Sequence, residues 1–118
     1  YDHVDIISGQ GTAALELHHQ LAADCADTLI TPVGGGGLLA GSAIASKSLA
    51  PQCRVIGAEP AAADDAYRGF YSGQRVTDHS PSSIADGLLT TLGVANFSII
   101  RQSVDSILRV EEQQIIEQ

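Results

Sequence analysis

The sequence predicts an α/β fold of three layers, in which a mostly parallel sheet is flanked by helices. Short, nearly continuous apolar runs alternate with helical segments along the 118 residues, in the order α–β–α–β–α–α–β–α. Such apolar runs are typical of parallel strands that are covered by helices. A chain of this length also falls in the usual size range of one domain. We therefore expect one α/β domain.

The first helix is expected over residues 13–22. Ala14, Leu17 and Leu21 recur at the spacing of one helical face, and Thr12 can cap the first turn. These apolar side chains are expected to face the core.

The first two strands and the helix between them are marked by prolines. Residues 28–33 form a short β-branched run, which predicts a strand. Residues 38–50 predict a helix rich in Ala, Gly and Ser that can lie close to a sheet, and Pro51 ends it. Residues 54–59 predict the second strand, which Pro60 closes.

The second half of the chain is expected to complete the alternation. Its expected elements are a helix over 64–71 ended by Ser72 and Gly73, a polar loop over 74–83, a helix over 96–102 capped by Asn96, a strand over 106–110 and a helix from Glu111.

A run of four glycines links the first strand to the second helix: Gly34, Gly35, Gly36 and Gly37. Each glycine loses extra backbone entropy on folding, but the run lets several N–H groups converge on one point. Such a loop at a helix N-terminus favours an anion, usually a phosphate. Leu38 and Leu39 follow in place of the Lys-Ser/Thr ending of a P-loop, which argues against triphosphate hydrolysis. The sequence predicts a site for a phosphorylated ligand.

Residues 9–14 match GxGxxA, a variant of the dinucleotide-binding fingerprint. That fingerprint also requires an acidic residue at the end of the next strand, and Val33 stands there. A tight turn into the first helix explains Gly9 and Gly11, so dinucleotide binding is a minor alternative.

Acidic side chains follow the second strand. Glu59, Asp64 and Asp65 place carboxylates just beyond its end, where they can bind a hard divalent cation. Acids at a helix N-terminus are also common because they suit the helix dipole. Spacing alone leaves both interpretations open.

The charge, the apolar runs and the cysteines of the chain indicate which binding partners and which cellular location to expect. The formal charge of −8, with the single lysine Lys47, argues against nucleic acid and anionic membranes. No apolar run approaches the roughly 20 residues of a membrane span, and no signal peptide is evident. Cys25 and Cys53 are consistent with reduced thiols in a cytoplasmic protein, and a disulfide between them is the alternative. We expect Lys47 to be solvated, and we expect surface positions for the histidines His3, His18, His19 and His79.

Five segments together resemble one family: residues 8–16, 32–41, 55–60, 84–88 and 96–107. The family is the fold-type-II pyridoxal-phosphate enzymes, in the branch of serine/threonine dehydratases and serine racemases. The resemblance covers essentially the whole chain but only the middle part of a full-length member. Since the chain also lacks methionine, we expect residues 1–118 to be one partial domain, a segment of the large cofactor domain.

The resemblance implies a set of site residues. It implies that Gly34, Gly35, Gly36 and Gly37 wrap the cofactor phosphate, that Leu38 contributes its amide, and that Gly87 lies beside the pyridine ring. Members with a divalent cation, Mg, Mn or Ca, use positions that correspond to the Glu59 carboxylate, the Ala63 carbonyl and the Asp65 carboxylate.

Other family motifs have no counterpart in the chain. These are the segment with the Schiff-base lysine, the Ser/Asn-rich loop that binds the substrate carboxylate, and the residue that bonds the pyridine nitrogen. Lys47 follows the phosphate loop in a helix and should not reach the cofactor aldehyde. We therefore predict an inactive fragment of a serine/threonine ammonia-lyase (dehydratase), whose parent forms a 2-oxo acid and ammonia.

Two alternatives stay open. The parent can instead belong with the serine racemases, because the sequence does not separate the two activities. Alternatively, the chain is a non-catalytic, anion-binding or self-assembling α/β module. Strand edges left without flanking segments predict a homo-oligomer in either case.

Overall fold

The computed structural model describes residues 2–21, 26–77 and 82–118. Its elements, in chain order, are α1 Val4–Leu21, β1 Thr28–Pro32, α2 Gly37–Leu49, β2 Arg54–Pro60, the 3-10 turn η1 Ala61–Ala63, α3 Asp65–Ser72, the 3-10 turn η2 Asp86–Leu88, α4 Val94–Ser103, β3 Ser106–Val110 and α5 Glu112–Glu117.

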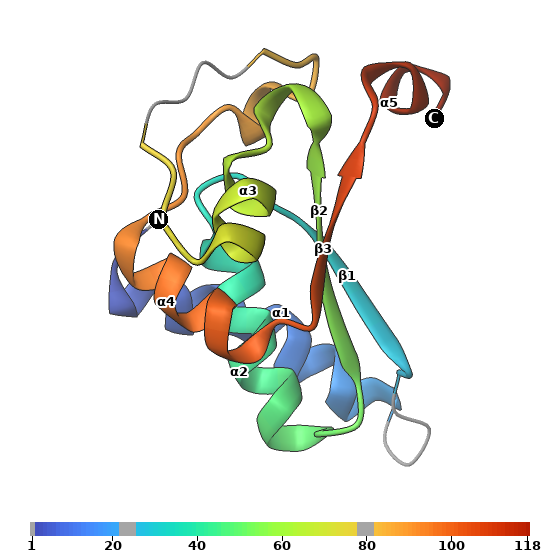
Figure 1. Cartoon of the computed structure of the whole chain (residues 1–118). Coiled ribbons are helices and arrows are strands. Elements are labelled where there is room, and N and C mark those ends of the chain that lie inside the picture. Colours follow the sequence, from blue (N-terminus) through green and yellow to red (C-terminus); the bar gives the residue numbers. More distant parts are fainter. Residues whose placement is uncertain (1, 22–25, 78–81) are drawn as a thin grey trace.

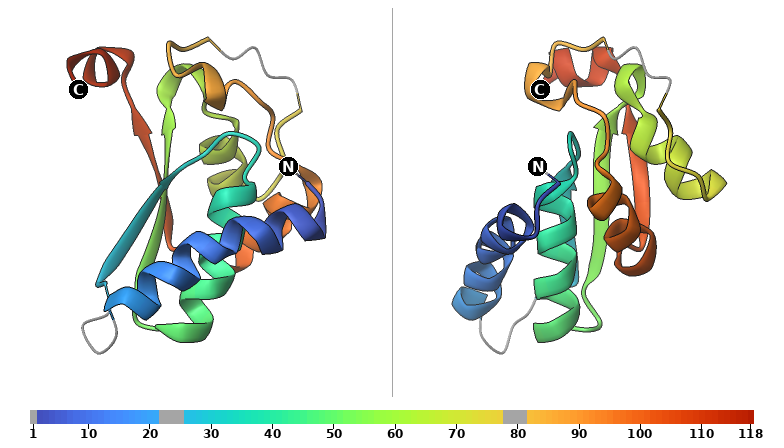
Figure 2. Two further views of the ribbon diagram at one scale, coloured as in Figure 1. Left: turned by 180° about the vertical axis from the view of Figure 1, so that it is seen from behind. Right: turned by 90° about the vertical axis from the view of Figure 1, so that its left-hand side faces the viewer.

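The three strands form one parallel sheet in the order β1-β2-β3, which confirms the α/β class. Figure 1 views the sheet nearly edge-on and shows α1 to α4 gathered on one side of it. The right-hand view in Figure 2 shows α2 next to the sheet and α1 packed outside α2. Because the strands are parallel, the carboxyl ends of all three lie at the same end of the sheet.

The core lies between the sheet and α2. Gly57 in the middle strand pairs with Thr31 and Ile107, and this row faces the helices. A Cβ atom at Gly57 would lie 2.7 Å from the Leu39 side chain and 2.8 Å from that of Val33. Small residues thus let α2 lie close to the sheet.

The other face of the sheet is partly exposed. Ile30 pairs with Ile56 on this face, and Leu108 lies on the same face two residues further along the strands, where it pairs with Ala58. The exposed fractions are 56% for Ile30 and 48% for Leu108. Among the described residues, no helix is both long and apolar enough to cross a membrane.

The N-terminal half of α1 corrects the prediction of a tight turn at Gly9 and Gly11. The helix begins at Val4, so both glycines lie inside it. A Cβ atom at Gly11 would lie 2.8 Å from the carbonyl oxygen of Gly41 in α2, and one at Gly41 would meet the Ile7 carbonyl. Gly11 and Gly41 are required by close helix–helix packing, which overrides their low helix propensity.

The start of α4 is also different from the prediction. The helix begins at Val94, and Asn96 lies inside it rather than capping it. The Asp2 carboxylate instead accepts hydrogen bonds from the N–H groups of Val94, at 2.9 Å, and Asn96, at 3.0 Å. Gly93 precedes the helix, and a Cβ atom there would collide with the Asp2 side chain. A carboxylate from a distant part of the chain therefore caps α4.

Two surface predictions are wrong. His18 is buried, and its Nε2 lies 2.9 Å from Ser46 Oγ of α2, because the α1 face that carries it packs on α2. Lys47 is not simply solvated, since its Nζ lies 2.7 Å from Asp105 Oδ2 and 3.1 Å from the Cys53 carbonyl oxygen. His3 and His19 are exposed as expected. His79 and Cys25 lie outside the described residues.

Asp2→Ala should destabilise the fold through α4. The substitution removes the acceptor for two N–H groups at the helix start, and loss of a cap typically lowers the free energy of unfolding by about 1 kcal/mol. We expect a lower midpoint in urea denaturation, with a smaller change in Asp2→Asn, which keeps one acceptor oxygen. Equal midpoints for Asp2→Ala and the unsubstituted chain would contradict this role.

Candidate functional site

A hollow of about 140 Å³ opens where the loop after β1 meets the N-terminus of α2. It lies at the carboxyl edge of the parallel sheet, where α/β folds commonly bind ligands. Its lining residues are Gln10, Pro32, Gly34, Gly35, Gly36, Gly37, Leu38, Gly87 and Leu88. The structure thus brings together all six residues predicted for the cofactor.

The glycine loop has a backbone path that side chains would block. Gly36 adopts a φ of +98°, in the left-handed region that favours glycine. A Cβ atom there would lie 2.5 Å from the Leu92 side chain and 3.0 Å from that of Asn96. At Gly34, a Cβ atom would lie 3.1 Å from the Gly87 carbonyl oxygen. Packing against the 87–96 segment therefore contributes to the need for glycines.

Asn96 and Gly93 orient the loop. The carbonyl oxygen of Gly35 accepts hydrogen bonds from the Asn96 side-chain amide, at 2.8 Å, and from the Gly93 N–H, at 3.2 Å. In a planar trans peptide, the N–H of the next residue points in the direction opposite to the carbonyl oxygen. The N–H of Gly36 is therefore directed away from α4. This role of Asn96 differs from the predicted cap, and its only sequence signal is a polar residue among apolar ones near a helix start.

The first turn of α2 has no side-chain cap among the described residues. Its N-cap residue is Gly36, which has no side chain to accept a hydrogen bond from the turn, and no acidic residue lies in the turn. The first helical hydrogen bond of this turn is from Ala40 N–H to the Gly36 carbonyl, at 2.9 Å. The preceding N–H groups at a helix start have no partner within the helix, and the dipole adds positive potential there. The turn suits an anion.

Gly87 borders the same hollow from η2. A Cβ atom at this position would find no atom within 4 Å. Packing of the described residues therefore does not require a glycine here. The open space beside Gly87 is compatible with a ligand group that extends from the loop.

The predicted metal residues lie nearby, on the segment from the end of β2 through η1 to α3. Glu59, Ala63 and Asp65 are all nearly inaccessible to solvent. Glu59 Oε1 accepts the Tyr67 N–H at 2.5 Å, while its Oε2 is buried and has no hydrogen-bond partner among the described residues. Asp65 Oδ2 accepts the Leu92 N–H at 2.6 Å.

Burial raises the pKa of Glu59 to about 8, and the nearby Asp65 carboxylate adds to the rise, although the Tyr67 N–H opposes it. Asp64 has a different environment, since it pairs with Arg68 at 2.9 Å and with Arg109 at 3.4 Å. Glu59 and Asp65 are therefore the two buried acids among the residues predicted to bind a cation.

The oxygen atoms of Glu59, Ala63 and Asp65 can provide some of the ligands that a hard cation needs. The unpartnered Glu59 oxygen, the Asp65 carboxylate and the Ala63 carbonyl are oxygen ligands of the kind that Mg²⁺ and Ca²⁺ prefer. Within residues 2–21, 26–77 and 82–118, no group of three or more His, Cys, Asp or Glu side chains is placed to hold a metal. Water would have to complete any coordination sphere.

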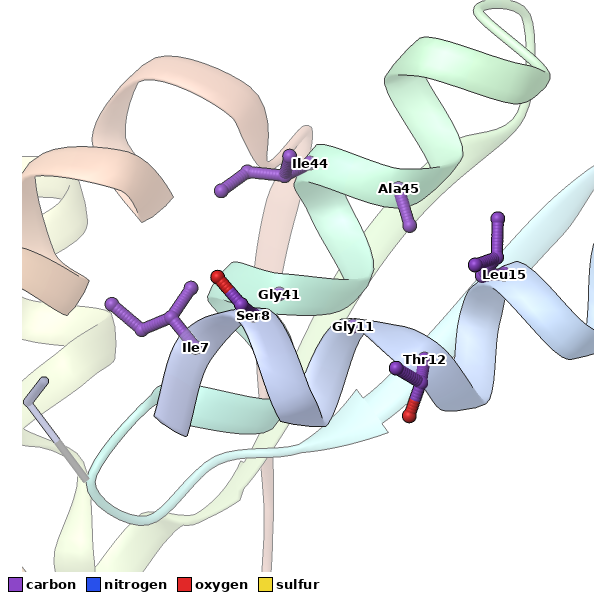
Figure 3. A pocket seen from close by; sticks show the side chains of 8 residues that line it. All are labelled: Ile7, Ser8, Gly11, Thr12, Leu15, Gly41, Ile44 and Ala45. Atoms are coloured by element: carbon purple, nitrogen blue, oxygen red, sulfur yellow. The ribbon is translucent and has the colours of Figure 1, made fainter. Parts of the chain in front are cut away.

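A second hollow, of about 170 Å³, lies between α1 and α2 and is shown in Figure 3. Its walls are mainly apolar, and Ser8 and Thr12 supply its only hydroxyl groups among the labelled lining residues. The backbone around it is helical, so its N–H groups are directed along the helices rather than into the hollow. It offers no convergent donors for an anion.

Glu59→Gln should remove a pH dependence of stability. In the folded chain Glu59 keeps its proton up to about pH 8, whereas the unfolded chain releases it near 4.5. Its contribution to stability is full below pH 4.5 and is lost as pH rises to about 8, a change on the order of a few kcal/mol.

The test is urea denaturation of the parent chain and Glu59→Gln in metal-free buffer across this pH range. The neutral amide keeps an acceptor for the Tyr67 N–H, so we expect a flatter profile for the variant. Parallel profiles would show that Glu59 is ionised in the folded chain.

Comparisons with known proteins show the family of the chain. Residues 1–118 match the family described as pyridoxal-phosphate dependent enzymes. The chain is 50% identical over 117 residues to a serine racemase from Dictyostelium discoideum, covering 98% of this chain and 36% of the relative. It is 48% identical over 117 residues to an L-threo-3-hydroxyaspartate ammonia-lyase from Saccharomyces cerevisiae, covering 98% of this chain and 35% of the relative.

The fold of the chain also matches that of solved enzyme structures. The fold matches that of a threonine deaminase from T.th. with a TM-score of 0.94 at 45% identity, covering 99% of this chain and 44% of that one. The chain spans about a third of the length of the curated relatives that it matches. Because the family match extends over the whole chain, the chain belongs to the pyridoxal-phosphate dependent enzymes.

Proposed function

We propose that this chain is the phosphate-binding segment of a pyridoxal-phosphate-dependent serine/threonine ammonia-lyase. The observation that carries the proposal is the uncapped first turn of α2, which follows a glycine loop and opens on a hollow. An anion there would satisfy N–H groups that no side chain of the described residues caps. The match to the pyridoxal-phosphate family supports a phosphorylated cofactor as that anion.

In this proposal the chain binds and orients the cofactor. The N–H groups of residues 34–38 hold its phosphate, and Gly87 leaves room for its ring. The cofactor, when bound, supplies an electron sink for chemistry at the substrate Cα. The described residues do not supply a reacting lysine, because Lys47 lies ten residues after the start of α2, about 15 Å along the helix axis, and is paired with Asp105. We expect no turnover by this chain alone.

The proposal includes a divalent cation, Mg, Mn or Ca, bound by Glu59, Ala63 and Asp65. The buried, unpartnered Oε2 of Glu59 supports it. Asp65 accepts the N–H of Leu92, and the Leu92 side chain packs at Gly36. A cation that neutralises these carboxylates would thus stabilise the segment on which the glycine loop rests.

Serine racemase is the alternative activity of the parent, since relatives with that name match about as closely as the ammonia-lyase. A cytoplasmic location stays a prediction. A second candidate function is a non-catalytic, anion-binding or self-assembling module that forms homo-oligomers. The apolar side chains of Ile30 and Leu108, both exposed on one sheet face, favour self-association.

The test is equilibrium binding of pyridoxal phosphate to the purified chain, with unphosphorylated pyridoxal as the ligand control. We expect pyridoxal phosphate to bind more tightly. Gly35→Asp should weaken its binding by more than about tenfold, because a carboxylate beside the loop repels the phosphate. Ser48→Asp makes the same charge change near the far end of α2 and should bind normally. Equal binding of the two ligands would contradict the proposal.

A further inference from the structure

One polar side chain lies at the hollow of the glycine loop. Apart from glycines, the other lining residues are Pro32, Leu38 and Leu88, so Gln10 is the only polar side chain among the described residues that line it. It comes from α1, a separate element from the loop. The sequence analysis treated it only as part of the GxGxxA match.

The close packing of α1 on α2 places Gln10 there. Gly11 lies against Gly41, and Gly41 is one helical turn beyond the start of α2 at Gly37. The missing Cβ atoms allow this close approach, since a Cβ atom at Gly11 would lie 2.8 Å from the Gly41 carbonyl oxygen. The residue before Gly11 is therefore held beside the loop that leads into α2.

The chemistry of Gln10 suits a ligand rather than its own helix. Its neighbours at the i±3 and i±4 positions are Ile6, Ile7, Ala13 and Ala14, which have no polar side-chain atoms. By contrast, Gln20 Nε2 on the same helix lies 3.4 Å from Glu16 Oε1. A carboxamide has two N–H donors, so it can donate a hydrogen bond to a phosphate oxygen.

We propose that Gln10 is a ligand-binding residue whose side-chain amide donates a hydrogen bond to the phosphate group held by residues 34–38. This inference rests on the proposed function, because it requires a phosphorylated ligand in the loop. It gives α1 a direct part in binding, beyond its packing on α2. The glycine at position 11 then serves to bring the carboxamide at position 10 to the phosphate.

The test is titration of the chain with pyridoxal phosphate and, separately, with inorganic phosphate. We expect about five- to tenfold weaker binding of both in Gln10→Ala, since a hydrogen bond to a charged group is lost. Gln10→Glu should bind more weakly still, and its affinity should fall as pH rises and the new carboxyl ionises. Gln10→Lys should restore binding, with a steeper dependence on salt.

Gln20→Ala is the matched control, because Gln20 is another exposed glutamine of α1 and does not line the hollow. It should bind as the unsubstituted chain does. Circular dichroism spectra and thermal midpoints of each variant establish that the fold is kept, which is expected for an exposed helical position.

Two outcomes overturn the inference, and they differ in what they leave standing. If the chain binds pyridoxal phosphate and Gly35→Asp abolishes binding, but Gln10→Ala and Gln10→Glu bind normally, only the role of Gln10 is refuted. If the unsubstituted chain binds neither pyridoxal phosphate nor inorganic phosphate, the proposed function fails with it.

Discussion

The hydrogen bonds that α4 makes to the carbonyl oxygen of Gly35 set the geometry on which the candidate site depends. Asn96 and Gly93 hold this oxygen on the α4 side, so the next N–H points away from α4. The same turn of α4 is capped by Asp2 from the other end of the chain. Residues at positions 2, 35 and 96 thus act together, and a loop of four flexible glycines gains one defined conformation.

Two further contacts join this arrangement to the rest of the fold. Asp65 binds the Leu92 N–H, and the Leu92 side chain packs where a Cβ atom of Gly36 would lie. On the opposite side, the contact between Gly11 and Gly41 brings α1 against the first turns of α2. The buried acids, the glycine loop and α1 therefore meet where the parallel strands have their carboxyl ends. Each of these contacts depends on a glycine at a close approach or on a buried polar group.

Local patterns were enough to predict the three strands from their short apolar runs, and Pro32 and Pro60 mark the ends of the first two. The run of four glycines is also a local signal, and Gly87, which the family resemblance groups with it, lines the same hollow. The errors have a common physical origin in contacts between distant segments. Gly11 was assigned to a turn because its partner Gly41 is 30 residues away, and Asn96 was assigned as a cap because the true cap, Asp2, is remote. Gln10 carried no local signal, since its place beside the loop follows from helix packing.

The most direct test of the central claim is residue-resolved NMR of the ¹⁵N-labelled chain during addition of pyridoxal phosphate, with pyridoxal added to a second sample. The largest phosphate-dependent shifts should belong to the N–H groups of residues 34–38, and pyridoxal should leave these signals in place. Shifts that are absent from this loop, or that centre on the apolar hollow between Ile7 and Ile44, would rule out phosphate binding by the glycine loop.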